Sequence, residues 1–249
     1  VDAMRADAVQ CVVPKYDITP NMDAVARDGV VFTRHYSVSN WTRPSTIAML
    51  ASTYGSSTGI NFYGFMVSRA EKEYFYRQSD VLPINMLLEH KGYITASIGN
   101  NAFMLDYSGI GVDLGFDELS EYETQVEDTV DITSEVISWL EENRHRNFFL
   151  FINLNAPHSH YIPPAQYREK TRDLAGQYHG WFRRYLGEVA YSDDYIGKVV
   201  QALKDMGLYD NTILVITSDH GEVFHPRHSI SPYTDKIGRA SCRERVCHR

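Results

Sequence analysis

The chain of 249 residues is 43% apolar and carries a formal net charge of −8. This length and composition suffice to bury the core of one domain, or most of one. The acidic balance argues against a nucleic-acid partner, because holding a phosphate backbone requires clustered Lys and Arg. The chain contains no run of about 18 apolar residues, so the sequence predicts no segment that spans a bilayer.

Apolar periodicity predicts helices and strands that alternate along the chain. Helices are predicted at residues 21–28, 44–52, 81–90, 130–143 and 196–206, and strands at residues 30–36, 93–98, 148–154 and 212–216. The last of these strands is an apolar run and is predicted to be buried and parallel. The Asp193-Asp194 pair is predicted to open the last helix, where acidic residues complement the helix dipole. Such alternation predicts an α/β fold with a mostly parallel sheet covered on both faces.

The last thirteen residues, 237–249, differ from the rest of the chain. They read like the translation of a sequencing-adapter oligonucleotide, and such non-native segments do not belong in reasoning about the fold. Because this tail carries a net charge of +3, the remaining chain has a formal charge of −11. The tail also contains Cys242 and Cys247, which leaves Cys11 as the native cysteine. A disulfide framework is therefore excluded.

Residues 217–222 (TSDHGE) directly follow the last predicted strand. In open α/β sheets, ligands bind beyond the carboxyl ends of the strands. Adjacent Asp219 and His220 at such a position suit a divalent cation that takes both oxygen and nitrogen donors. The alternative is an Asp that caps a turn beside a solvated His.

Three further segments accompany this motif. They are residues 1–7 (VDAMRAD) continued by residues 19–32 (TPNMDAVARDGVVF), residues 40–46 (NWTRPST) and residues 155–164 (NAPHSHYIPP). In this order and at these separations they resemble the sulfatase family of the alkaline phosphatase superfamily, as a variant with a threonine nucleophile. The resemblance implies a three-layer α/β/α sandwich with a mostly parallel central sheet. It further implies that residues 1–236 are the N-terminal part of a sulfatase-like catalytic domain that is truncated at both ends.

The resemblance places Asp2, Thr42, Asp219 and His220 on a divalent metal ion. Thr42 occupies the position at which formylglycine sulfatases carry the Cys or Ser of Cys-x-Pro-Ser-Arg, and phosphoesterase relatives carry a threonine nucleophile. A threonine hydroxyl needs a bound cation to lower its pKa, and a helix N-terminus favours the anionic group under attack. The alternative is that Thr42 only caps the helix. The donors suit Ca²⁺, Mn²⁺, Mg²⁺ or Zn²⁺, and the single His favours Mn²⁺ or Zn²⁺.

Three histidines are further candidates for catalysis. His158 matches the histidine of the family's Pro-His motif, which donates to a non-bridging oxygen or protonates the leaving group. His160 either substitutes for His158 or is solvated. His228 resembles a later histidine that contacts the transferred group or a second metal, and the nearby His225 competes for that assignment.

Departures from the family pattern bear on the reaction. Oxidation of Thr42 would give a ketone rather than an aldehyde, so we expect no formylglycine. Thr46 stands where sulfatases carry an arginine, and residues 99–102 (GNNA) replace their Gly-Lys-Trp-His segment. The loss of these cationic side chains favours phosphate or phosphonate esters, with Asn100 or Asn101 as neutral donors to the substrate oxygens.

The leading hypothesis is a metal-dependent hydrolase that cleaves sulfate or phosphate esters through a covalent threonyl intermediate. One alternative is a membrane-associated transferase of phosphoethanolamine or phosphoglycerol type, in which an alcohol replaces water. Another is a non-catalytic relative that binds anions. The expected substrate is a small-molecule, glycan or lipid ester. The resemblance implies a periplasmic or extracellular-facing location, whereas the sequence indicates neither membrane association nor oligomeric state.

Overall fold

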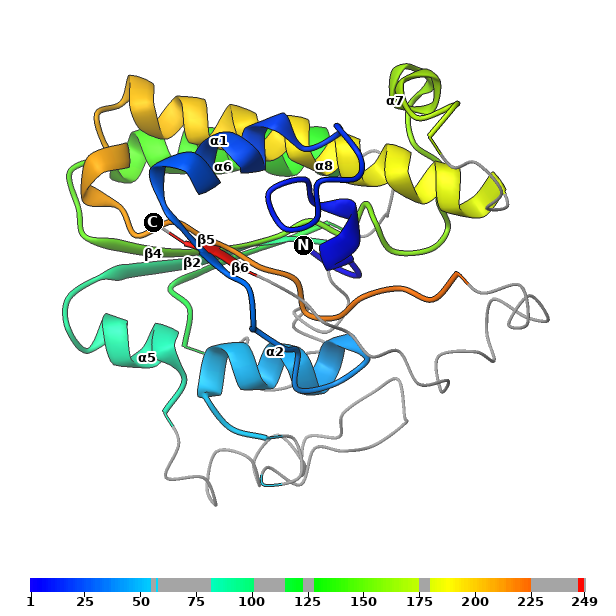
Figure 1. Cartoon of the computed structure of the whole chain (residues 1–249). Helices are drawn as coiled ribbons and strands as arrows, with labels where there is room; N and C mark the ends of the chain where they lie inside the picture. Colours follow the sequence, from blue (N-terminus) through cyan, green and yellow to red (C-terminus); the bar gives the residue numbers. More distant parts are fainter. Residues whose placement is uncertain are drawn as a thin grey trace. The chain divides into compact units, whose positions relative to one another are not determined.

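The computed structural model describes residues 1–54, 57, 82–100, 115–122, 128–174, 180–224 and 246–248 (Figure 1). The chain divides into two compact units. The terminal unit comprises Val1–Asn40 and Leu154–Arg249, and the middle unit comprises Trp41–Asn153. In the described parts of the chain, every helix is too short or too polar to cross a membrane.

A parallel sheet forms the centre of the middle unit. Its three strands lie in the order β3-β2-β4, and their bounds are β2 Ile94–Gly99, β3 Glu118–Glu121 and β4 Phe148–Asn153. Strand β2 pairs in parallel with both neighbours, from Ile94 opposite Phe148 to Gly99 opposite Asn153 on the β4 side. All but the last residue of β2 are buried, as expected for a central parallel strand. The predicted strands at 93–98 and 148–154 are therefore confirmed.

Helices cover both faces of this sheet. They are α5, Ile84–Glu89, and α6, Asp128–Asn143, and both contact β2. Figure 1 shows the two helices on opposite sides of the strands. On α6, the apolar stripe of Ile132, Val136 and Leu140 is buried, at the spacing of an amphipathic helix. A third helix, α2, Thr42–Ala51, packs against α5. The local architecture is thus α/β/α, as predicted.

The terminal unit is built around one long helix, α8, Gly180–Asp205. Helices α1, Pro20–Asp28, and α7, Ala165–Lys170, both pack against α8, and short 3₁₀ helices occupy Ala6–Ala8 and Tyr209–Asn211. The core between these elements is rich in aromatic residues: Tyr161, Phe182, Tyr185, Tyr191 and Tyr195 belong to it.

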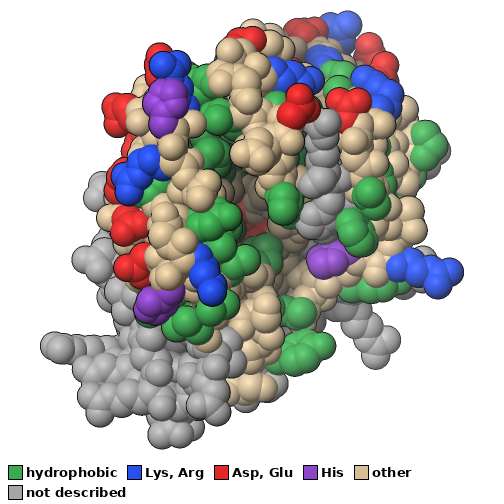
Figure 2. Space-filling model, turned by 90° about the vertical axis from the view of Figure 1, so that its left-hand side faces the viewer, with side chains coloured by type: hydrophobic (Ala, Val, Ile, Leu, Met, Phe, Trp, Pro, Cys, Tyr) green, Lys and Arg blue, Asp and Glu red, His purple; other side chains and the backbone are tan. Residues whose placement is uncertain are grey.

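On the face drawn in Figure 2, acidic side chains lie beside basic ones, so the described residues there form no purely basic patch.

Helix α8 begins sixteen residues before the predicted start at 196. The Asp193-Asp194 pair therefore lies inside the helix, and the prediction that it opens a helix is wrong. The apolar residues Phe182, Tyr185 and Val189 form a buried stripe at helical spacing, which extends the helix toward its N-terminus. Buried Asp193 instead accepts hydrogen bonds from the N–H groups of Asn21 (3.0 Å) and Met22 (2.9 Å). It thereby satisfies the free amides at the start of α1.

The strands of the terminal unit also differ from prediction. They are β1, Val30–Phe32, β5, Val215–Ile216, and β6, Val246–His248, in the antiparallel order β1-β6-β5. The prediction of a buried strand at 212–216 is wrong, because β5 has two residues and neither is buried. The antiparallel partner of β5 is β6, which lies in the tail of residues 237–249. Ile213 is 82% exposed and Val215 46% exposed. An apolar run is buried only where other elements cover it, and the described elements leave these side chains open.

Candidate metal centre

The terminal unit brings Asp2, Asp219 and His220 together. Their potential ligand atoms all lie within 4.8 Å of one another. His220 Nε2 is 3.4 Å from Asp2 Oδ1 and 3.5 Å from Asp219 Oδ2. All three residues are buried, and neither of these carboxylate oxygens has a hydrogen-bond donor among the described residues. Two buried carboxylate oxygens therefore face the same imidazole nitrogen.

A backbone contact orients the His220 ring, with Nε2 on the side of the two carboxylates. The other ring nitrogen, Nδ1, lies 2.8 Å from the carbonyl oxygen of Gly221. Because a carbonyl oxygen only accepts hydrogen bonds, Nδ1 is assigned the hydrogen. Nε2 is then the ring nitrogen that a cation between the two carboxylates would bind. A backbone carbonyl that orients the imidazole in this way is a common feature of metal-binding histidines.

Backbone hydrogen bonds orient the two carboxylates. Asp219 Oδ1 accepts the N–H groups of Ala3 (3.1 Å) and His220 (2.9 Å), which leaves Oδ2 facing Nε2. The N–H of Asp2 donates to the carbonyl of Leu154 (2.9 Å). Ala3 has a φ of 54°, a left-handed conformation that is uncommon for residues other than Gly. The turn at Ala3 thus links Asp2 to the carboxylate of Asp219, the second candidate ligand.

The electrostatics of the cluster suit a cation. Burial, together with the neighbouring charge of Asp219, raises the pKa of Asp2 to about 6, although His158 and His220 act in the opposite direction. Burial lowers the pKa of His220, but the charges of Asp219 and Asp2 outweigh it, so the net pKa is raised. Two adjacent buried carboxylates are costly to ionise without a compensating positive charge. Two carboxylate oxygens and one imidazole nitrogen form a donor set that fits a divalent cation.

The three candidate catalytic histidines differ in their surroundings. His158 is partly buried, and its charge acts on the pKa of Asp2. Its Nδ1 lies 2.9 Å from the carbonyl oxygen of Ser159, so Nδ1 is assigned the hydrogen, as in His220. Nε2 is then the ring nitrogen that does not contact this carbonyl. His160 is exposed to solvent. His228 and its competitor His225 lie outside the described residues.

In the middle unit, Thr42 is the first residue of α2 and is 6% exposed. The helix therefore begins two residues before the predicted start at 44. The N-cap position belongs to Trp41, which has an extended backbone, so Thr42 does not occupy the capping position. The guanidinium of buried Arg43 lies over the Trp41 ring, 5.4 Å from its centroid. Of the two predicted neutral donors, Asn100 is buried directly after β2, and Asn101 lies outside the described residues.

Several residues that contact the cluster are not predictable from the sequence. Ser37 hydrogen-bonds to the carbonyl of Asp219, and the N–H of Met4 donates to Ser218 Oγ (3.0 Å). Tyr185, on α8, hydrogen-bonds to the segment that carries Asp2. None of these contacts has a signal in the sequence, because each joins residues far apart in the chain.

An α/β unit with a parallel sheet, together with a buried Asp-Asp-His cluster, defines a protein of the alkaline phosphatase-like class with a candidate metal centre. The chain belongs to the sulfatase family, since the family model described as Sulfatase matches residues 1–238. The predicted family is thereby confirmed.

Curated relatives are distant and longer. An arylsulfatase of Clostridium perfringens is 23% identical, over 90% of this chain and 62% of the relative. An ulvan-active sulfatase of Formosa agariphila is 24% identical, over 82% of this chain and 40% of the relative. The chain thus spans less than two thirds of the length of these relatives.

Solved structures share the fold over most or all of the chain. The crystal structure of Ps i-CgsB in complex with k-i-k-neocarrahexaose has a TM-score of 0.77 at 20% identity, over 100% of this chain and 64% of that one. A phosphonate monoester hydrolase of Silicibacter pomeroyi has a TM-score of 0.75 at 20% identity (100% and 66%). The lipoteichoic acid synthase LtaP of Listeria monocytogenes has a TM-score of 0.70 at 17% identity (100% and 63%). These likenesses confirm the predicted three-layer α/β fold class.

Proposed function

We propose that the whole protein is a metal-dependent hydrolase of sulfate or phosphate esters, and that Thr42 forms a covalent ester with the transferred group. The observation that carries this proposal is the buried cluster of Asp2, Asp219 and His220. Its two carboxylate oxygens lack hydrogen-bond donors among the described residues and face the same imidazole nitrogen. A divalent cation is the partner that satisfies all three atoms at once.

In this proposal the cluster residues hold the cation through Asp2 Oδ1, Asp219 Oδ2 and His220 Nε2. When bound, the cation would act as a Lewis acid that lowers the pKa of a hydroxyl group and neutralises charge on the substrate. The protein's part is to keep these donor atoms oriented, through Ala3 N–H on Asp219 and the Gly221 carbonyl on His220. Oriented donors lose little freedom on binding the cation.

Thr42 is proposed as the nucleophile because of its motif and its place at the start of α2. The first-turn amides of a helix bind anions, so they favour the sulfuryl or phosphoryl group under attack. Thr42 Oγ1 forms a bond to sulfur or phosphorus, its proton passes to solvent, and the bond to the leaving oxygen breaks. His158 supplies a proton to that oxygen, so that an alcohol departs. Water then cleaves the threonyl ester and restores the Thr42 hydroxyl.

The two ester classes have different support. Family membership favours sulfate esters, and the similar proteins named above include an ulvan-active sulfatase and a complex with a neocarrahexaose. Thr42 cannot form the aldehyde on which sulfatases of this family usually depend. The cationic side chains that those sulfatases carry at the positions of Thr46 and residues 99–102 are also missing from this chain. Within the proposal these departures favour phosphate or phosphonate esters, and glycan or lipid esters are the substrate classes to test.

The test uses the full-length protein without residues 237–249. Aryl sulfate, phosphate, phosphodiester and phosphonate esters are offered after metal removal and after addition of Mn²⁺, Zn²⁺, Ca²⁺ or Mg²⁺. We expect metal-dependent turnover that falls by at least about 10³-fold in Thr42→Ala. The matched control is Thr133→Ala, which removes another buried threonine hydroxyl of the middle unit and should leave turnover unchanged.

Each other outcome has a defined meaning. Turnover that survives both chelation and Thr42→Ala would overturn the mechanism. Cleavage of sulfate esters alone would show that the departures at Thr42, Thr46 and residues 99–102 do not favour phosphate or phosphonate esters. Transfer to an added alcohol instead of water would identify the transferase alternative. Anion binding without turnover of any ester would identify the non-catalytic relative.

A further inference from the structure

A tyrosine of α8 contacts the loop that carries the first ligand residue. Tyr185 is fully buried, and its hydroxyl lies between two backbone groups of residues 2–5. It donates to the carbonyl of Ala3 (2.9 Å) and accepts the N–H of Arg5 (2.6 Å). Burial raises the pKa of Tyr185 well above its ordinary value, so the hydroxyl keeps the hydrogen that it donates. Both hydrogen-bonding directions of one hydroxyl are thus used on this loop.

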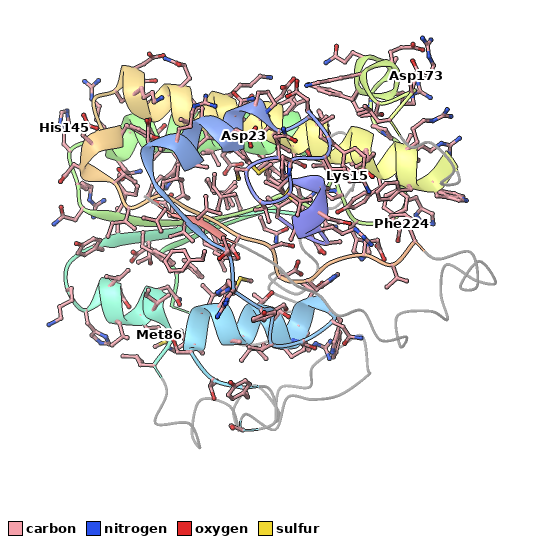
Figure 3. The ribbon with its side chains drawn as sticks, viewed as in Figure 1. Lys15, Asp23, Met86, His145, Asp173 and Phe224 are labelled. Carbon is pink, nitrogen blue, oxygen red and sulfur yellow. The ribbon has the colours of Figure 1, made fainter. Side chains whose placement is uncertain are left out.

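The ring of Tyr185 contacts the segment that carries the other two ligand residues. Its centroid lies 4.9 Å from that of Phe224, which follows His220 by four positions and is labelled in Figure 3. Phe182, one turn earlier on α8, packs on the Phe224 ring, with the two centroids 5.1 Å apart. Arg5 Nη1 also joins the two segments, since it donates to the carbonyl of Glu222 (2.5 Å). Tyr185 therefore lies where the Asp2 loop and the segment from Asp219 to Phe224 are joined.

The contact with Ala3 matters because of the conformation of that residue. A non-Gly residue at positive φ persists only where its surroundings hold it there. In this conformation the N–H of Ala3 donates to Asp219 Oδ1, while its carbonyl accepts from Tyr185. Without the hydroxyl, the Ala3 carbonyl would be buried without this donor, and the backbone would be free to relax toward negative φ. That relaxation would turn Asp2 and withdraw a hydrogen bond from Asp219.

We propose that Tyr185 is a positioning residue of the metal centre, which holds Asp2 and Asp219 in the orientation that a divalent cation requires. This inference rests on the proposed function, because it concerns the same metal site. Partners that orient metal ligands typically change metal affinity by 10–100-fold when they are removed, roughly the range expected for this hydroxyl. Tyr185 itself contributes no ligand atom.

The experiment compares two tyrosine variants by metal binding, which needs no substrate. Tyr185→Phe removes the hydroxyl and keeps the ring. Tyr167→Phe is the matched control, since Tyr167 is a buried tyrosine of the same core whose hydroxyl donates to Asp194 (2.7 Å). Calorimetric titration with Mn²⁺ should show affinity weaker by roughly 10–100-fold for Tyr185→Phe and unchanged for Tyr167→Phe. Equal affinity in Tyr185→Phe and the wild type would overturn the inference.

A second variant guards against a general loss of folding. Adding Ala3→Gly to Tyr185→Phe removes the steric cost of positive φ, so it should restore folding and part of the lost Mn²⁺ affinity. If the double variant still does not fold, the role of Tyr185 is structural and the inference is overturned. If the wild type itself fails to bind Mn²⁺, Zn²⁺, Ca²⁺ or Mg²⁺, the proposed metal centre fails, and the inference fails with it. The two failures are therefore distinguishable.

Discussion

Replacing Glu188 by Gln should remove a large part of the pH dependence of folding. Glu188 lies on α8, is 2% exposed, and accepts the N–H of Ile162 at 2.7 Å. Burial raises the pKa of this carboxyl to about 8, although the hydrogen bond from Ile162 lowers it. Gln has the same shape and retains an acceptor oxygen, but it does not titrate. The comparison therefore isolates the proton on Glu188.

The sign and the size follow from the two pKa values. The ordinary pKa of the carboxyl is 4.5 and the folded value is about 8, so between these values the folded state binds more protons than the unfolded state. The stability linked to this proton is fully present below about pH 4.5 and is lost as the pH rises to about 8. One pKa unit corresponds to about 1.4 kcal/mol, which gives a loss on the order of 3 kcal/mol between about pH 5 and about pH 8.

The assay is urea unfolding of the wild type and of Glu188→Gln at several pH values in this range. We expect the free energy of unfolding of the wild type, relative to the variant, to fall by on the order of 3 kcal/mol from the acidic to the alkaline end. Other groups titrate in both proteins, and their contributions cancel in the difference. A difference that does not change with pH would refute the reasoning that Glu188 is buried with its proton.

Two further predictions concern a buried hydrogen-bond acceptor and a close contact between paired strands. Asp193→Ala removes the acceptor of the Asn21 and Met22 N–H groups and should cost about 2 kcal/mol of stability, as measured by urea unfolding; a change within error would show that these amides find water. Gly99→Ala places a Cβ 2.7 Å from the carbonyl oxygen of Asn153 on the paired strand and should cost about 1–3 kcal/mol, whereas a neutral result would show that β2 and β4 separate without strain.

The elements of the middle unit agree best with the sequence-based predictions. Strands at 93–98 and 148–154 and the helix at 130–143 agree with β2, β4 and α6 to within about two residues at each end. These elements have strong local signals: continuous apolar or β-branched runs for strands that are covered on both faces, and an apolar stripe at helical spacing for α6. Local patterns suffice where burial follows directly from the pattern.

The errors occurred where contacts with distant residues decide the structure. The run at 212–216 has the composition of a buried strand, yet Ile213 is 82% exposed. Helix α8 starts at Gly180, because aromatic residues spaced along its first turns pack into the core with α1 and α7. An Asp is typical of the first turn of a helix, but buried Asp193 lies inside α8. It accepts hydrogen bonds from the N–H groups at the start of a different helix, α1.

The sequence by itself determined the family and the kinds of donor atoms, because motifs such as TSDHGE and NWTRPST are local and their order along the chain is characteristic. Only the tertiary structure decided that Asp2 Oδ1 and Asp219 Oδ2 face the same nitrogen of His220. It also decided that the N–H of Ala3 donates a hydrogen bond to Asp219, 216 positions away, and that Tyr185 contacts both segments. The physical reason is that hydrogen bonds and ligand geometry depend on distances of a few ångströms, which sequence separation does not specify.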